Sequence, residues 1–340
     1  MNKAPLVSIC VVNFNGIRFL REFFESLYSQ TYKNFEVIFV DNDSTDASVE
    51  YTENNYQKVK VIKNKKNSGY ADGNNIAYSE SKGDYLLIVN NDIVFKEDLI
   101  ENLLYAFSDI KNLGVVQPMV RLYADQDKLD ACGSFWTSTG FNYHLGIYKQ
   151  FNLPIYNTSI QLYSVKGMCM MTKRSVIEEI GLFDPDFWCY FEETDFCHRA
   201  LLAGYECWYY PKSYVFHHLG GSSNKNPNFQ IQYHSFKNRL CSYLKNLEII
   251  NLLKILPVYF LMNLCWSFGK LLVGDIKNFK VPYKAVIWNI KNIQNTLIKR
   301  RKIQLELRRL SDYKALKRVK NNPRLYYYYC LIIGLDKYKD

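Results

Sequence analysis

The sequence lacks the glycine-rich patterns with which many nucleotide-binding proteins hold phosphates. Neither G-x-G-x-x-G nor G-x-x-x-x-G-K-[ST] occurs in the 340 residues, which argues against a dinucleotide enzyme and a P-loop NTPase. The nine cysteines form no C-x-x-C pair, so reduced thiols are expected rather than a disulfide framework. No charged-then-apolar leader precedes the first strand-like run, and no signal peptide is expected. These absences favour a cytoplasmic globular protein.

Acidic residues are scarce in the last third of the chain. Residues 236–340 carry 22 lysines and arginines against six acidic residues, a net charge of +16, whereas residues 1–235 carry a net charge of −6. Such a basic segment predicts an anionic partner. Its charges alternate with aliphatic residues rather than with stacking aromatics, so no nucleic-acid partner is expected.

Residues 284–310 have the pattern of an amphipathic helix. Val286, Ile290, Ile293 and Leu297 recur at helical spacing before the basic run 299–302. The pattern is typical of a helix lying on an anionic membrane surface, although a solvated helical face has the same pattern.

An uncharged run long enough to span a bilayer is also missing. Residues 249–273 are strongly apolar, but Pro257 interrupts them and only 15 residues separate Lys254 from Lys270. A span needs roughly 20 residues. The segment therefore predicts one or two buried or interfacial helices, and packing against the remaining domain is the alternative.

Strand and helix patterns alternate in the first 90 residues. Continuous β-rich runs at 6–12, 35–40, 59–62 and 84–89 alternate with helical patterns at 19–29, 46–56 and 74–81. This alternation predicts an α/β fold around a parallel sheet.

Polar residues follow the carboxyl ends of three of these runs. The clusters are Asn13/Asn15, Asp41/Asp43 and Asn90-Asn91-Asp92. In open α/β sheets ligands bind at this edge, although asparagine and aspartate are also favoured in turns. Asp92, with a downstream histidine such as His217, has the chemistry to hold a hard divalent cation on a diphosphate.

Three carboxylates lie close together between aromatic residues. Glu192, Glu193 and Asp195 follow Trp188, Tyr190 and Phe191. Burial would raise their pKa and favour a general base, whereas a helix N-terminus would stabilise the anions. The structural alternative is an acidic helix start in which Asp195 pairs with Arg199.

Together these motifs resemble glycosyltransferase family 2, the inverting nucleotide-sugar-dependent enzymes of GT-A fold. The rhamnosyltransferase and galactofuranosyltransferase branch is the most similar. The resemblance covers about residues 5–225, and six motifs occur in order: residues 7–16, 40–46, 67–71, 90–92, 181–184 and 192–199.

The resemblance implies a role for individual residues. Glu193 is the expected catalytic base, with Glu192 beside it and Asp195 in support. Asp92 and His217 are the expected ligands of Mg²⁺ or Mn²⁺, and Gly167 and Trp188 the expected acceptor contacts. The expected nucleotide-sugar contacts are Val12, Asn13, Asn15, Asp41, Asp43, Asn67, Gly69, Asn90 and Asn91.

Two positions depart from the family pattern. Asn90 stands where the first aspartate of a D-x-D motif is usual, and Glu193 stands where aspartate is commoner. The Q-x-x-R-W signature of processive synthases is absent, so a polymer-extruding synthase is not expected.

The sequence thus predicts a catalytic domain followed by a helical extension. Residues 1–224 are expected to form a GT-A domain with a mostly parallel central sheet and helices on both faces. Its nucleotide-sugar half is expected at about 1–115 and its acceptor half at 116–224. Residues 225–340 form the basic, membrane-associating extension in this prediction.

The predicted function is transfer of a sugar from a nucleotide-diphosphate donor to a saccharide acceptor of lipid-linked or lipopolysaccharide type. The protein is expected on the cytoplasmic face of the cell membrane. The alternatives are a nucleotidyltransferase of similar fold and a non-catalytic nucleotide-sugar-binding module.

Overall fold

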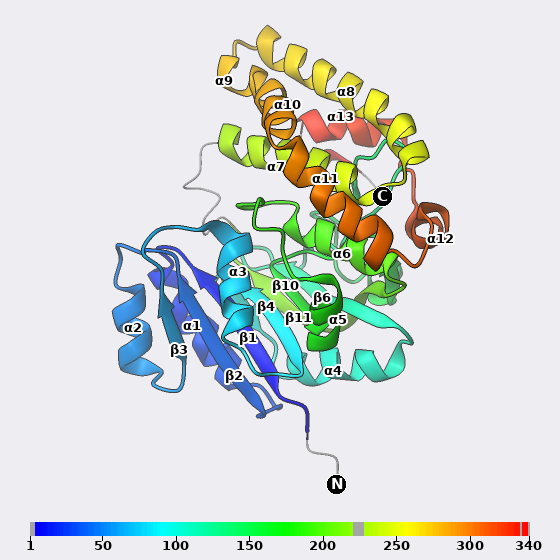
Figure 1. Cartoon of the computed structure of the whole chain (residues 1–340). Coiled ribbons are helices and arrows are strands. Elements are labelled where there is room, and N and C mark those ends of the chain that lie inside the picture. Colours follow the sequence, from blue (N-terminus) through cyan, green and yellow to red (C-terminus); the bar gives the residue numbers. More distant parts are fainter. Residues whose placement is uncertain (1–3, 220–227, 334, 339–340) are drawn as a thin grey trace.

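The fold is organised around one large mixed sheet (Figure 1). The computed structural model describes residues 4–219, 228–333 and 335–338. The strands are β1 (Val7–Asn13), β2 (Phe35–Asp41), β3 (Lys60–Lys63), β4 (Tyr85–Asn90), β5 (Ile93–Phe95), β6 (Leu113–Leu122), β7 (Ser134–Phe135), β8 (Tyr143–His144), β9 (Ile160–Leu162), β10 (Cys169–Lys173) and β11 (Glu206–His217). Nine of them form the sheet in the order β3-β2-β1-β4-β10-β6-β11-β5, with β9 added beside β11. β7 and β8 make a separate pair.

The sheet is parallel only in part. β1 pairs in parallel with β2 and β4, and β2 pairs in parallel with β3. These four strands confirm the parallel βα units expected in the first 90 residues. β10 then runs antiparallel to both β4 and β6. Because β10 is antiparallel to both of its neighbours, the sheet is mixed rather than mostly parallel. Antiparallel neighbours need no crossover helix between them.

Helices cover both faces of the sheet. They are α1 (Ile17–Tyr28), α2 (Ser48–Asn55), α3 (Gly69–Ser79), α4 (Leu99–Asp109), α5 (Arg174–Ile180) and α6 (Glu192–Leu202). Alternate residues of β1 point to opposite sides: Ile9 and Val11 join the cluster with α1 and α4, whereas Cys10 joins the cluster with α3, α5 and α6. The helical spacing of apolar residues in α1 correctly predicted its buried face, because Leu20, Phe23, Phe24 and Leu27 are all fully buried.

Further helices lie over α6, on one side of the sheet (Figure 1). They are α7 (Asn228–Asn246), α8 (Ile249–Leu272), α9 (Ile276–Phe279), α10 (Val281–Lys291), α11 (Ile293–Lys302), α12 (Asp312–Leu316) and α13 (Leu325–Ile333). A π-helical turn, Ile303–Leu307, continues α11. One hydrophobic cluster contains Phe196 of α6, Tyr243 of α7 and Tyr259 of α8. The C-terminal helices therefore share a core with the sheet domain.

The apolar segment near residue 250 forms one long helix rather than a short one. α8 continues through Pro257 for 24 residues. Among the residues that the structure describes, it is the one helix long and apolar enough to cross a membrane by length and composition. The expectation that this segment is too short to span a bilayer was wrong, because lysines within a helix do not end it.

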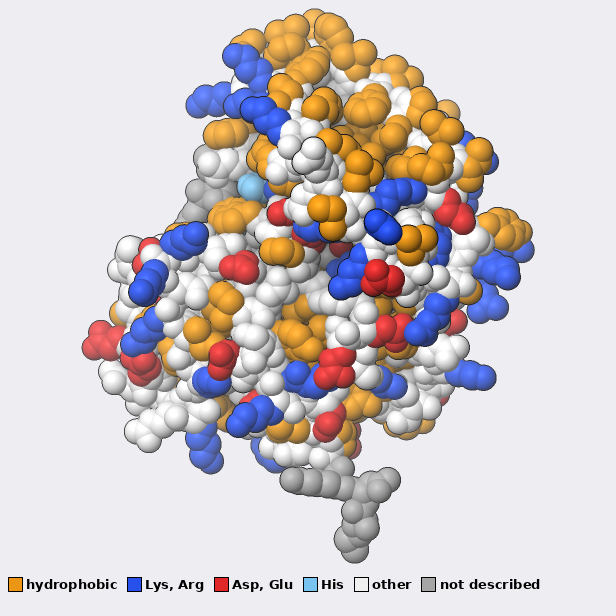
Figure 2. All heavy atoms as spheres, viewed as in Figure 1, with side chains coloured by type: hydrophobic (Ala, Val, Ile, Leu, Met, Phe, Trp, Pro, Cys, Tyr) orange, Lys and Arg blue, Asp and Glu red, His pale blue; other side chains and the backbone are white. Residues whose placement is uncertain are grey.

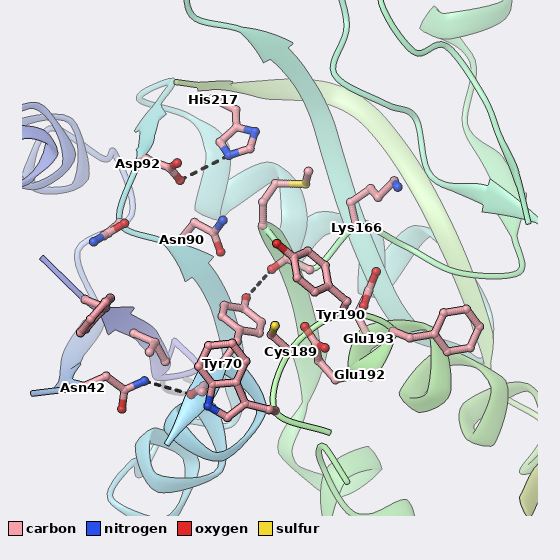
Figure 3. Close-up of a pocket in the computed structure, with 18 of the residues that line it drawn as sticks. Asn42, Tyr70, Asn90, Asp92, Lys166, Cys189, Tyr190, Glu192, Glu193 and His217 are labelled. Atoms are coloured by element: carbon pink, nitrogen blue, oxygen red, sulfur yellow. Dashed lines mark hydrogen bonds and ion pairs between the residues drawn. The ribbon is translucent and has the colours of Figure 1, made fainter. Parts of the chain in front are cut away.

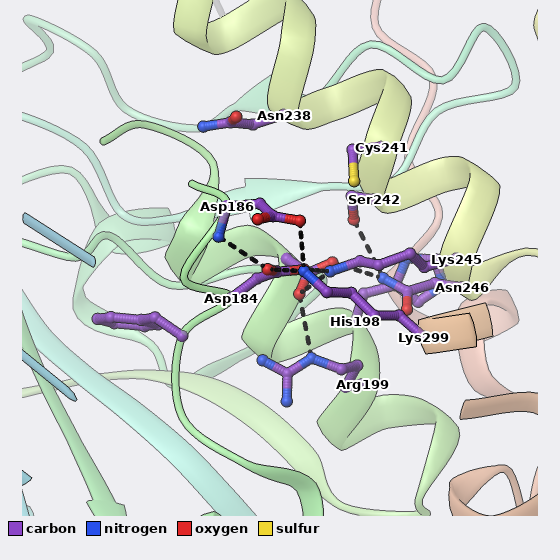
Figure 4. A network of polar contacts seen from close by, with 12 residues as sticks. Asp184, Asp186, His198, Arg199, Asn238, Cys241, Ser242, Lys245, Asn246 and Lys299 are labelled. Atoms are coloured by element: carbon purple, nitrogen blue, oxygen red, sulfur yellow. Dashed lines mark hydrogen bonds and ion pairs between the residues drawn. The ribbon is translucent and has the colours of Figure 1, made fainter. Parts of the chain in front are cut away.

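A buried ion network joins α7 to α6 (Figure 4). The Lys245 ammonium contacts the carboxylates of Asp184 and Asp195, at 3.1 Å from the latter. Arg199 Nε donates to Asp195 at 3.0 Å. Although burial opposes it, Lys245 and Arg199 hold the pKa of Asp195 well below its usual range. Asp195 is thus fully buried and paired with Arg199 and Lys245, and the supporting catalytic role expected for it stays a prediction.

Candidate functional site

A cavity of about 380 Å³ opens at the carboxyl ends of β1 and β4 (Figure 3). The loop before β10, the N-terminus of α6 and the end of β11 complete its walls. Eleven residues expected in the site line it: Val12, Asn67, Gly69, Asn90, Asn91, Asp92, Gly167, Trp188, Glu192, Glu193 and His217. The sequence motifs therefore converge on one place.

Five expected residues do not line the cavity. Besides Asp195, they are Asn13, Asn15, Asp41 and Asp43. Asn13 is fully buried, donates to Asp41 Oδ1 at 2.8 Å and accepts from Asn91 at 2.6 Å. These bonds tie the ends of β1 and β2 to the turn after β4. Asn13 and Asp41 thus fix the strand ends next to the cavity, and the nucleotide contacts expected for them stay a prediction.

The other two polar residues lie in turns outside the cavity lining, and the nucleotide contacts expected for them stay a prediction. Asn15 Oδ1 accepts from the backbone N–H of Thr45 at 2.7 Å and of Asp46 at 3.2 Å. Asp43 is exposed and has a left-handed backbone with φ of 63°, a conformation that aspartate tolerates better than most residues.

The loop that carries Trp188 closes directly onto the start of α3. The backbone N–H groups of Tyr70 and Ala71 donate to Trp188 O at 2.8 and 3.3 Å. A Cβ at Gly69 would lie 2.3 Å from that carbonyl, and φ at Gly69 is +85°. Only glycine permits this close approach. The helix predicted over residues 74–81 begins five residues earlier, at Gly69.

Two strained residues introduce the acidic helix start. Tyr190 and Phe191 have φ of 67° and 74°, which costs non-glycine residues of order 1–3 kcal/mol each. The Asn238 amide of α7 donates to the carbonyls of Cys189 and Tyr190 at 2.9 and 2.6 Å. Asn238 is fully buried. A residue of the C-terminal helices therefore holds the conformation of the loop at the cavity.

Glu192 and Glu193 begin α6 and both reach the cavity. Burial and the neighbouring Glu193 raise the pKa of Glu192 well above its usual value. Burial also raises the pKa of Glu193, but Lys166 opposes that rise. Glu193 is the more exposed of the two. Glu192 therefore holds a proton more tightly than Glu193 does.

Asp92 and His217 form the opposite wall of the cavity (Figure 3). His217 Nε2 lies 3.3 Å from Asp92 Oδ1, and Nδ1 lies 2.6 Å from Asp130 Oδ2. Although burial opposes it, hydrogen bonds to Asp130 and Asp92 raise the pKa of His217 to about 10. A carboxylate behind a histidine orients that ring towards a metal in many sites.

These residues fit a divalent cation whose remaining ligands come from elsewhere. Within the described ranges, no group of three or more His, Cys, Asp or Glu side chains is arranged to hold a metal ion. Mg²⁺ is commonly bound by one or two protein carboxylates plus waters and substrate phosphates. Asp92 suits that mode, with the Asn90 amide also in the cavity lining. His217 would join it as a ligand after losing the proton that Asp130 and Asp92 stabilise, because a metal-bound imidazole is neutral.

Several cavity residues were not predicted. Asn42 donates to Gly69 O at 3.0 Å, and the Tyr70 hydroxyl donates to Gly167 O at 2.7 Å. Lys166 lines the cavity next to the expected Gly167. The remaining unpredicted residues are Phe14, Met168, Cys189, Tyr190, Phe191 and Leu219. Phe14, Asn42 and Tyr70 lie inside the recognised motifs, so their position in sequence was the available signal.

Residues 8–181 match the model of the family described as "Glycosyl transferase family 2", about half of the chain. The chain belongs to glycosyltransferase family 2. The N-acetylglucosaminyl-diphospho-decaprenol L-rhamnosyltransferase of Mycobacterium tuberculosis is 24% identical over 65% of this chain and 79% of its own length. Two other curated relatives, from Sinorhizobium fredii and Streptococcus pneumoniae, are matched over only 25% and 34% of their own lengths.

Solved structures confirm the fold of this family 2 protein. GalNAc-T7 with UDP, GalNAc and Mn²⁺ superposes with a TM-score of 0.60 at 15% identity, covering 87% of this chain and 58% of its own. The mannosyltransferase PcManGT of Pyrobaculum calidifontis, in complex with GDP-Man and Mn²⁺, gives a TM-score of 0.51 at 14% identity. That match covers 90% of this chain and 88% of the other. The α/β architecture of GT-A type is therefore established.

We expect Asn238→Ala to loosen the loop at the cavity. The variant loses two hydrogen bonds, worth roughly 1 kcal/mol each, so amide hydrogen exchange at residues 189–192 should become at least about tenfold faster. Asn289→Ala is a matched control, because Asn289 is equally buried and donates to the carbonyls of Lys237 and Ala285 instead. Equal acceleration at residues 189–192 in both variants would show that Asn238 has no specific hold on the loop.

Proposed function

We propose that the protein is an inverting glycosyltransferase that moves a sugar from a nucleoside-diphosphate sugar to a hydroxyl of a saccharide acceptor. One observation carries the proposal: a single cavity holds the pair Asp92 and His217 on one wall and Glu193 on the other. The pair Asp92 and His217 suits the diphosphate end of a donor, and Glu193 suits the role of general base. An inverting transfer needs these two functions on opposite sides of the anomeric carbon.

The donor end of the cavity is formed by the β1–β2 edge and the start of α3. Val12, Asn42, Asn67 and Gly69 line it, and they offer apolar contact and amide groups suited to a base and a ribose. Asp92 and His217 would hold Mg²⁺ or Mn²⁺ against the donor phosphates. A divalent cation supplies charge neutralisation to a departing diphosphate.

Glu193 is the proposed base. An acceptor hydroxyl gives its proton to the Glu193 carboxylate while its oxygen forms a bond to the anomeric carbon. The bond from that carbon to the diphosphate breaks on the opposite side, so the configuration inverts. Burial raises the pKa of Glu193, and the neighbouring Lys166 ammonium limits that rise, which favours the ionised base relative to a glutamate with no cation beside it.

The proposed acceptor is a lipid-linked saccharide at the cytoplasmic face of a membrane. The name of the mycobacterial relative, which contains a diphospho-decaprenol acceptor, supports this class. Gly167 lies beside Glu193, and Trp188 lines the same cavity next to Gly69. They offer an open backbone and an aromatic face to a sugar ring. A nucleotidyltransferase is disfavoured, because Asn13-Phe14-Asn15-Gly16 lacks the basic, glycine-rich loop that binds a triphosphate.

We predict that Glu193→Gln lowers kcat by about 10²–10⁴-fold, the usual contribution of a general base. Donor affinity, measured by calorimetry, should stay nearly unchanged because the nucleotide contacts other residues. Glu192→Gln should cost less and raise the acceptor KM. Burial raises the pKa of Glu193, and the base works only when it is ionised. Wild-type kcat should therefore fall as the pH is lowered, with a midpoint above the ordinary glutamate pKa of about 4.3.

The choice between the two glutamates is decided by the same kinetics. If Glu193→Gln keeps more than about a tenth of wild-type kcat while Glu192→Gln is inactive, the base is Glu192. If neither substitution changes turnover of any nucleotide sugar, and no nucleotide sugar raises the melting temperature, the non-catalytic alternative replaces the enzyme.

Chelation tests the proposed metal ligands. EDTA should abolish transfer, and adding Mg²⁺ or Mn²⁺ back should restore it. Asp92→Ala and His217→Ala should weaken transfer strongly, whereas Asn90→Ala should do less because a neutral amide binds a hard cation weakly. Full activity in EDTA would contradict a cation on the donor phosphates.

A further inference from the structure

The C-terminal helices expose a continuous apolar surface. Figure 2 shows hydrophobic side chains gathered over the end of the molecule formed by α8, α9 and α10. One face of α8 packs on the protein, through Leu252, Ile255, Tyr259, Asn263 and Ser267. The other faces expose large side chains, with Leu253 at 66%, Leu261 at 60%, Phe268 at 52% and Leu272 at 87% exposed.

Neighbouring helices extend this surface. Ile276 at the start of α9, Ile287 and Ile290 on α10, and Ile298 on α11 are 47–70% exposed. We call these residues, with the exposed residues of α8, the apolar cap. Soluble monomers rarely expose contiguous apolar patches this extensive, and such patches mark contacts with proteins or membranes.

The charges around the apolar cap favour an anionic bilayer as its partner. Lys254, Lys277, Lys280, Lys284 and Lys291 are exposed beside it, and within the described part of the chain none of them forms an ion pair. Asp275 is the only acidic residue between positions 249 and 305. A surface that combines large apolar side chains with unpaired lysines matches the acyl and headgroup layers of an anionic membrane.

The basic character of the C-terminal third is therefore divided between two uses. Lys245 and Lys299 are turned inwards, because they pair with Asp184, Asp195 and Asp186. The lysines beside the apolar cap have no such partners among the described residues. The inward-facing lysines and the lysines beside the apolar cap carry the same charge, and they differ in burial.

The contacts of α8 favour a helix that lies on the membrane rather than one that crosses it. The Tyr259 hydroxyl donates to Phe236 O at 2.9 Å, and Ser267 Oγ donates to Phe279 O at 2.6 Å. These bonds join α8 to α7 and to the end of α9 along its length. A crossing helix would have to break both bonds and leave its buried face.

We propose that the apolar cap inserts into one leaflet of an anionic membrane, with its flanking lysines at the headgroups. The whole protein would then be held by the surface of α8 to α11, with no segment passing through the bilayer. This attachment goes beyond the proposed transfer and does not depend on Glu193, so the two proposals fail separately.

The test is co-sedimentation of the full chain with vesicles of phosphatidylcholine, with and without phosphatidylglycerol. The triple variant Leu261→Glu, Leu264→Glu, Phe268→Glu should lower binding to both vesicles at least about tenfold, because three apolar side chains no longer insert. The matched control replaces three exposed apolar residues elsewhere, Tyr105→Glu, Leu153→Glu and Ile155→Glu, and should bind as the wild type does.

A charge variant separates insertion from attraction. Lys277→Glu, Lys280→Glu, Lys284→Glu should lower binding to the anionic vesicles only, and salt should remove this difference because surface charges are screened within about 8 Å. Unchanged binding of the apolar triple variant would overturn the proposal. A wild-type dimer in light scattering that the triple variant dissolves, without vesicle binding by either, would assign the apolar cap to a second copy of the chain.

Discussion

The buried contact between Lys245 and the carboxylates of Asp184 and Asp195 connects the two parts of the molecule. α6 carries the two glutamates of the cavity and Asp195 in its first turn. Because α7 supplies the cation, α6 is fixed from the C-terminal side of the chain. Removing one partner of such a buried pair typically costs about 3–5 kcal/mol. The orientation of the acidic helix start therefore depends on residues more than 40 positions away.

The loop before α6 shows the same dependence. The left-handed backbone of Tyr190 and Phe191 carries a conformational free-energy cost of about 1–3 kcal/mol for each residue. The two hydrogen bonds from Asn238 offset only roughly 1 kcal/mol each. Packing supplies the remainder, because the Phe191 ring is buried against Tyr243 of α7 and lies under the Arg239 guanidinium. The two strained residues lie directly before the two adjacent glutamates that line the cavity. Polar bonds and packing from α7 thus act on the same short loop.

Local patterns predicted the first half of the fold well, because strand and helix periods there coincide with burial. The face of α1 and the parallel strands β1 to β4 followed directly from residue spacing. Three outcomes required tertiary contacts. β10 turned out antiparallel, Asp195 paired with a lysine 50 positions away, and α8 continued through a proline. Whether residues 1–224 and 225–340 behave as separate domains stays a prediction, although their side chains share one core.

The sequence predicted the residues of the candidate site to about the same extent as it predicted the fold. Eleven of the sixteen residues expected in the site line the cavity, but Asn13 and Asp41 bond to each other next to it. Which of several clustered polar residues faces a ligand is set by the twist of the strand ends, which spacing alone does not reveal. Lys166 was missed because a single lysine in a glycine-containing loop has no pattern, and its effect on Glu193 exists only in three dimensions.

The anomeric configuration of the product is the most direct test of a base at Glu193 facing a cation site at Asp92 and His217. Nuclear magnetic resonance of the newly formed glycoside, made with a donor of known configuration, measures it. Attack by an acceptor oxygen opposite the departing diphosphate predicts a product of inverted configuration. A product that retains the configuration of the donor would contradict the arrangement of the two walls of the cavity.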